Sequence, residues 1–142
     1  MTVSAAERRR GLIFFLVALI AAFVALRTWL GITPNADLDI LGYNIHHLFA
    51  GILIVTATSI PLAIGVGPGR GRDLLVAGLG VGLGFVLDEW VYLIATPGTN
   101  ADYLRPVSLI GGIVMIALAV VYALICSGFA SGRGRDTTPT TR

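Results

Sequence analysis

The chain of 142 residues contains no lysine, because all ten of its basic residues are arginine. Chemistry that needs lysine is therefore excluded, including a Schiff base to retinal, a phosphate-binding loop and a lysine base. The single cysteine, Cys126, rules out a disulfide, a redox dithiol or a cysteine-rich zinc site within one chain. The net charge is only +2, and its arginines are spread over termini and loops, so nothing favours nucleic-acid binding.

Charged residues are also scarce, at 13% of the chain, whereas soluble proteins carry about a quarter. Hydrophobic residues make up 56% of the sequence, and 18 residues are glycine. A surface facing water needs more polar side chains than this, whereas a surface facing lipid does not. The composition therefore predicts a single-domain integral membrane protein.

Four apolar segments are each close to the ~20 residues that span about 30 Å of hydrocarbon. Backbone groups in lipid must bond within their own segment, so these stretches are predicted to be helices. Proline and glycine punctuate the short connections between them. The sequence thus predicts an all-α, polytopic, four-helix up-down bundle over residues 12–128, between a tail at 1–11 and a disordered tail at 129–142. The predicted spans are 12–30, 45–66, 74–96 and 107–127.

Arginine placement predicts the orientation of these spans. One arginine cluster precedes the first span, a second separates the middle two, and a third follows the last: Arg8, Arg9 and Arg10; Arg70 and Arg72; Arg133, Arg135 and Arg142. The other two loops together contain a single arginine, Arg105. Both termini are therefore predicted to be cytoplasmic, in the cytoplasmic membrane. A cleaved signal peptide is the alternative for the first span, but the apolar run continues to Leu30 without a clear cleavage site.

Glycine recurs at every second position of the third predicted helix. At 100° per residue, Gly78 and Gly82 share one face, and Gly80 and Gly84 lie nearly opposite. Each pair has the small-xxx-small spacing that lets two helix backbones approach closely. We therefore expect this helix to be central, with neighbours on two sides, one of which could belong to a second protomer or another membrane partner.

Five ionisable residues fall inside or at the edge of the spans, and all five are predicted in the outer half of the bilayer. We call them the polar cluster; they are Arg27, His46, His47, Asp88 and Glu89. Placing one charged residue at the centre of a spanning helix costs about 2.5–3.5 kcal/mol, so such residues need partners.

A divalent metal site is the leading functional hypothesis for this cluster. Imidazole and carboxylate groups from facing helices are suitable ligands for zinc, iron or manganese, with His46, His47, Asp88 and Glu89 as the ligand set. In a metal-dependent enzyme, one of the two carboxylates would serve as ligand or as base for a bound water. A haem with two axial histidines would need a dimer, because both histidines lie on one helix.

Three other hypotheses stay open. The cluster could be a structural ion pair of Arg27 with a carboxylate, as in an accessory subunit. It could bind an outer-leaflet lipid or small molecule, with Arg27 and Arg105 holding an anion. It could take part in proton-coupled transport, although the cytoplasmic halves of the spans lack ionisable partners.

Two motifs resemble a family of small uncharacterised prokaryotic multi-pass membrane proteins. The first is Ile45-His46-His47 followed by Gly51, and the second is Gly82-x-Gly84-x-x-Leu87-Asp88-Glu89-Trp90 on the next helix. The resemblance covers roughly the middle half of the chain. It implies a shared site at the histidines and carboxylates of the polar cluster, but no particular reaction.

Overall fold

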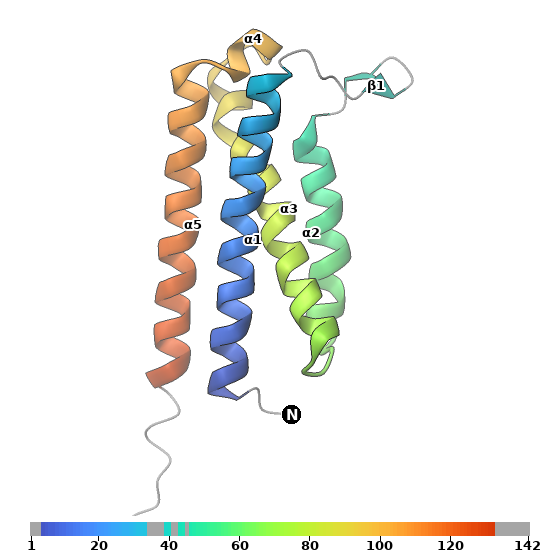
Figure 1. Ribbon diagram of the computed structural model, residues 1–142, viewed down its shortest axis with the longest axis vertical. Helices are drawn as coiled ribbons and strands as arrows, with labels where there is room; N and C mark the ends of the chain where they lie inside the picture. The colour runs from blue at the N-terminus through green and yellow to red at the C-terminus, as the bar shows by residue number, and fades with distance from the viewer. Residues whose placement is uncertain (1–3, 34–38, 41–42, 45, 133–142) are drawn as a thin grey trace, which may run out of the picture.

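The computed structural model describes residues 4–33, 39–40, 43–44 and 46–132, and these are almost entirely helical. The long helices lie side by side, and a short helix and a small strand pair lie at one end (Figure 1). The helices are α1 (Ala5–Ile32), α2 (His47–Ala63), α3 (Arg70–Ala95), α4 (Asn100–Tyr103) and α5 (Pro106–Gly132), and the strands are β1 (Asp39–Ile40) and β2 (Tyr43–Asn44).

Three of the helices, α1, α3 and α5, are long and apolar enough to cross a membrane. Helix α2 is equally apolar but has only 17 residues, which is shorter than the predicted span at 45–66. The large apolar side chains that point away from neighbouring helices are exposed along the bundle, for example Leu53 and Leu118. An exterior of this kind fits a lipid environment and makes the chain compatible with a membrane protein.

Helix α1 starts at Ala5, well before the predicted span at residue 12. The reason is a capping box, in which the Ser4 hydroxyl accepts from the Glu7 backbone N–H and the Glu7 carboxylate accepts from the Ser4 N–H. Helix α3 also begins earlier than predicted, at Arg70. The predicted C-terminal tail starts inside α5, which runs to Gly132, and its residues from 133 onward lie outside the described residues.

Helix α3 lies between α1 and α2 (Figure 1). Helix α5 also packs on α3 and contacts α1, whereas α2 packs along α3 and, in the described part of the chain, not along α1 or α5. The glycines of α3 lie in these contacts. A Cβ added at Gly82 would lie 2.9 Å from the Gly51 carbonyl oxygen of α2, and one at Gly84 would lie 2.9 Å from the Leu19 carbonyl oxygen of α1.

The other two α3 glycines follow the same division. A Cβ at Gly78 would meet the Thr58 side chain of α2 at 2.7 Å, and one at Gly80 would meet the Phe15 carbonyl oxygen of α1 at 2.5 Å. Glycine therefore brings α3 close to a different neighbour on each of its two faces. The buried apolar core lies between α1, α3 and α5 and consists of Leu19, Phe23, Leu87 and Ile116.

Two small elements were absent from the sequence prediction. Strands β1 and β2 form a two-residue antiparallel pair in which Ile40 lies opposite Tyr43. Helix α4 follows Gly98, whose φ of 82° favours glycine, and starts with a second capping box between Thr99 and Asp102. Helix α4 matters for the site because it ends at Tyr103.

Candidate functional site

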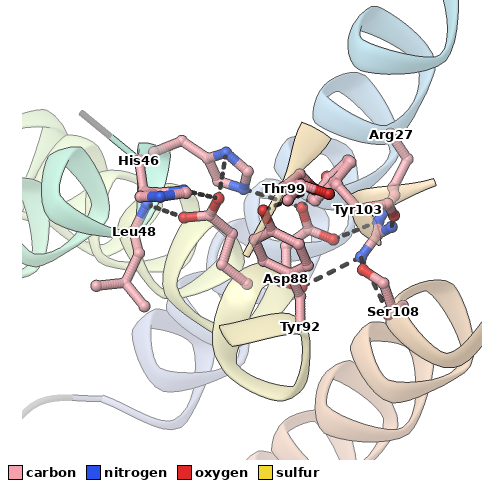
Figure 2. Close-up of polar contacts among 10 residues, drawn as sticks. Arg27, His46, Leu48, Asp88, Tyr92, Thr99, Tyr103 and Ser108 are labelled. Carbon is pink, nitrogen blue, oxygen red and sulfur yellow. Dashed lines mark hydrogen bonds and ion pairs between the residues drawn. The ribbon is translucent and has the colours of Figure 1, made fainter. Parts of the chain in front are cut away.

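The polar cluster gathers at one end of the molecule, where all five helices meet. Arg27 is near the C-terminal end of α1, both histidines are at the start of α2, and the two carboxylates are in the last two turns of α3. Figure 2 shows the resulting network, which extends from His46 at one side through Asp88 to Arg27 and Ser108 at the other. The structure thus brings all five residues of the polar cluster together.

Asp88 is the most buried charged residue of this network, with no exposed surface. Its Oδ1 lies 2.5 Å from Arg27 Nε, so a buried Arg–Asp ion pair joins α3 to α1. Its Oδ2 lies 3.0 Å from His47 Nε2 of α2 and accepts a hydrogen bond from the Tyr103 hydroxyl of α4. One carboxylate therefore connects four helices.

The Arg27 guanidinium makes several further contacts at the same place. It donates to the backbone oxygens of Tyr103, Asp88 and Ser108 at 3.0, 3.2 and 3.1 Å, and to the Ser108 hydroxyl at 3.1 Å. It also lies over the Tyr103 ring, 4.1 Å from the ring centroid. Because its donors are taken up by protein oxygens, Arg27 is better placed for an ion pair than for binding an external anion.

Glu89 forms the second half of the network and is 2% exposed. Its Oε2 accepts a hydrogen bond of 2.8 Å from the Leu48 backbone N–H, which is in the first turn of α2. Its Oε1 lies 3.1 Å from His46 Nδ1 and 3.4 Å from His47 Nδ1. Glu89 thus fastens the start of α2 to α3, on the same face of α3 as Gly78 and Gly82.

His47 lies between the two carboxylates, with one ring nitrogen toward each of them. A neutral imidazole has one N–H and can donate to only one carboxylate, whereas a protonated imidazole donates to both. The ring also packs edge-on against Phe85 and Tyr103.

Two further members of the network, Tyr103 and Ser108, are not among the residues of the predicted polar cluster. Both are buried. A sequence signal for Tyr103 did exist, because Thr99-x-x-Asp102 after Pro97-Gly98 has the spacing of a capping box and predicts a helical turn there. Ser108 has no comparable signal, since its role depends on the approach of α5 to Arg27.

The close approach of α5 depends on Gly112. A Cβ at this position would lie 2.9 Å from Phe23 Cε2, 3.2 Å from Arg27 Nη2 and 3.3 Å from Asp88 Oδ1. The absence of a side chain therefore lets α5 cover the Arg27–Asp88 ion pair and exclude lipid and water from it.

The predicted ligands of a divalent metal are His46, His47, Asp88 and Glu89. Among the residues whose side chains are described, no three His, Cys, Asp or Glu side chains are arranged so that they could hold a metal ion. The imidazoles and carboxylates pair with one another instead, and every buried side-chain nitrogen or oxygen in this part of the chain has a hydrogen-bond partner. The donor types suit zinc, iron or manganese, but their arrangement in this structure is that of a hydrogen-bonded network.

Arg105 does not share the environment of Arg27. Its side chain is 63% exposed, and its Nε lies 3.1 Å from Asp102 Oδ1, three residues earlier in the chain. The two arginines predicted as an anion-binding pair therefore have different partners and different exposure.

Comparison with protein-family models, with curated proteins and with solved structures finds no match to this chain.

Proposed function

We propose that this chain is a structural or accessory protein of the cytoplasmic membrane, and that the polar cluster is the ion-paired core that holds its helices together. The observation that carries this proposal is the fully buried Asp88 carboxylate, which is bound at once by Arg27, His47 and Tyr103. A buried ion pair of this kind has little capacity left for a substrate, because its donors and acceptors are already used.

The proposed topology has four crossings with both termini in the cytoplasm, and α2 as the fourth span beside the three longer helices. The placement of the arginines supports it. Arg10 and Arg72 lie at the N-terminal ends of α1 and α3, at the end of the molecule opposite the polar cluster. This arginine-rich end suits the cytoplasmic side, which leaves the polar cluster in the outer half of the bilayer.

The proposal can be tested by replacing the ion pair with apolar side chains of similar size. When a buried ion pair serves only to hold a fold, an apolar pair is often neutral or stabilising, whereas removal of one partner is strongly destabilising. We expect the Arg27→Met/Asp88→Leu double variant to accumulate and unfold like the wild type in detergent, and each single variant to unfold more readily. A double variant that fails to accumulate in the membrane would contradict a purely structural role.

A divalent metal site at Glu89 is the second candidate. It is supported by the donor types, because the Nδ1 atoms of His46 and His47 lie 3.1 and 3.4 Å from one Glu89 oxygen and such groups are suitable zinc ligands. To bind an ion, these side chains would have to exchange their hydrogen bonds with one another for bonds to the metal. Elemental analysis of the purified wild type, beside a His47→Ala/Glu89→Gln variant, separates the two candidates. Near-stoichiometric zinc, iron or manganese in the wild type alone would establish the metal site and displace the structural proposal. Absence of metal from the wild type after supplementation of the growth medium would rule out the metal-site candidate.

A further inference from the structure

A small cavity lies at the end of the molecule opposite the polar cluster. It has a volume of about 270 Å³ and is formed by the first turns of α1 and α3 and by the loop that precedes α3. Pockets for drug-sized ligands are usually about 300–1,000 Å³, so this cavity suits a smaller polar group. It is lined by Glu7, Arg10, Pro68, Gly69, Arg72 and Asp73.

The four charged residues of this cavity are not equally engaged. Arg10 and Asp73 form an ion pair with each other. Arg72, by contrast, has no hydrogen bond or ion pair among the described residues, and its interaction with Glu7 is electrostatic attraction without a direct bond. A Cβ built at Gly11 would lie 3.4 Å from Arg72 Nη1, so the guanidinium lies alongside α1. The Arg72 donors therefore remain available to a ligand in the cavity.

Glu7 offers the complementary group. Its Oε2 accepts the 2.9 Å hydrogen bond from the Ser4 backbone N–H, while its Oε1 accepts none within the described part of the chain. With two arginines and two carboxylates, the lining has no net charge. A simple anion would meet carboxylates as well as guanidinium groups, so a ligand that carries both signs fits better.

We propose that this cavity binds the headgroup of a zwitterionic phospholipid that carries a phosphate and a primary ammonium, as in phosphatidylethanolamine. Arg72 would hold the phosphate, because a guanidinium donates two parallel hydrogen bonds to phosphate oxygens. Glu7 would accept from the ammonium group. The choice of a membrane lipid rests on the proposed topology, which puts this end of the molecule at the level of the cytoplasmic headgroups, and is independent of the role of the polar cluster.

Native mass spectrometry of the full chain in detergent tests this directly. The protein is mixed with equal amounts of phosphatidylethanolamine and phosphatidylglycerol that have the same acyl chains. We expect the wild type to retain phosphatidylethanolamine in preference. Arg72→Gln should lower retention of both lipids about tenfold, because each loses a charge-assisted contact to phosphate. Glu7→Gln should lower retention of phosphatidylethanolamine alone, by a similar factor.

Glutamine preserves the capping box at the start of α1, so helix formation should survive in the Glu7→Gln variant and can be checked by circular dichroism. Arg105→Gln is the matched control, since this arginine is at the opposite end and is also beside a carboxylate; it should bind both lipids like the wild type. Preference of the wild type for phosphatidylglycerol, or unchanged binding in Arg72→Gln, would overturn the proposal. Equal competition by soluble O-phosphoethanolamine would identify a soluble ligand instead of a lipid.

Discussion

In the described part of the chain, two Arg–Asp ion pairs join α1 to α3, and they differ in burial and in the number of their further partners. Arg27–Asp88 lies at one end of α1 and α3, where the two side chains are 12% and 0% exposed. Arg10–Asp73 lies at the other end, where they are 54% and 15% exposed. The first pair is covered by α4 and α5 and has further partners for both members, whereas the second lies at the rim of an open cavity.

The comparison shows that residue type alone does not set the energetic role of an ion pair. An exposed pair contributes little to the free energy of unfolding, because water solvates its separated charges and the side chains lose conformational freedom when they meet. A buried pair resists separation, because an unpaired charge in an apolar interior is very unfavourable. The two ends of α1 and α3 should therefore respond very differently to the same substitution.

The largest effect is expected for Arg27→Met. This change leaves Asp88 buried without its arginine partner and in contact only with His47 and Tyr103, so the free energy of unfolding should fall by about 3–5 kcal/mol. Equilibrium unfolding in detergent, followed by circular dichroism, measures this loss. A loss below about 1 kcal/mol would mean that the buried Arg27–Asp88 pair contributes no more than an exposed pair.

A smaller loss of unfolding free energy is expected for a substitution where α1 and α3 approach each other beside the Arg27–Asp88 pair. Gly84→Ala adds a Cβ that would lie 2.9 Å from the Leu19 carbonyl oxygen and 3.1 Å from Ala22 Cβ, so the helices must separate. Overpacking of this kind costs about 1–3 kcal/mol. Gly71→Ala, near the exposed pair on the same helix, is the control: a Cβ there meets nothing within 4 Å, and the unfolding free energy should not fall.

Tyr103→Phe sharpens the comparison further, because it removes only the hydroxyl that donates to Asp88. Burial, with the nearby Asp88 charge, raises the pKa of Tyr103, so this hydroxyl keeps its proton throughout the neutral range. Its loss from a buried carboxylate should lower the free energy of unfolding by about 1–2 kcal/mol. Tyr122→Phe, at a side chain that is 69% exposed on α5, should change it by less than about 0.5 kcal/mol. Equal effects at the two tyrosines would argue against a covered network.

The smallest effect is expected for Arg10→Met at the exposed pair. Surface ion pairs contribute about 0–1 kcal/mol to stability, so the free energy of unfolding should fall by no more than this amount. Any difference from the wild type should shrink as salt is added, because added ions screen exposed charges. A loss as large as that of Arg27→Met, or one that is insensitive to salt, would remove the contrast between the two ends.

Much of the site could be predicted because helix periodicity carries the information. Asp88 continues the face of Gly80 and Gly84, and it meets Arg27 on α1. Glu89 continues the face of Gly78 and Gly82, and it meets the start of α2. The prediction that the ionisable groups need partners inside the protein follows from the cost of burying charge, and the Arg27–Asp88 ion pair confirms it.

Other features could not be read from these patterns. The metal hypothesis depended on whether donors converge on one point or pair with each other, which residue types do not determine. The network uses a backbone N–H of Leu48 and backbone oxygens of Tyr103 and Ser108, and every residue carries such groups. Their involvement depends on how helices from distant parts of the chain approach.

The sequence by itself determined that the chain is helical and apolar, that charges are rare inside it, and that α3 has two glycine faces ending in two carboxylates. These properties follow from composition and from the 3.6-residue period, which are local. Only the tertiary structure decided that Asp88 binds Arg27, His47 and Tyr103 together, and that Gly112 lets α5 cover the pair. The physical reason is that the energy of a charge depends on its surroundings, and these come from helices far apart in the sequence.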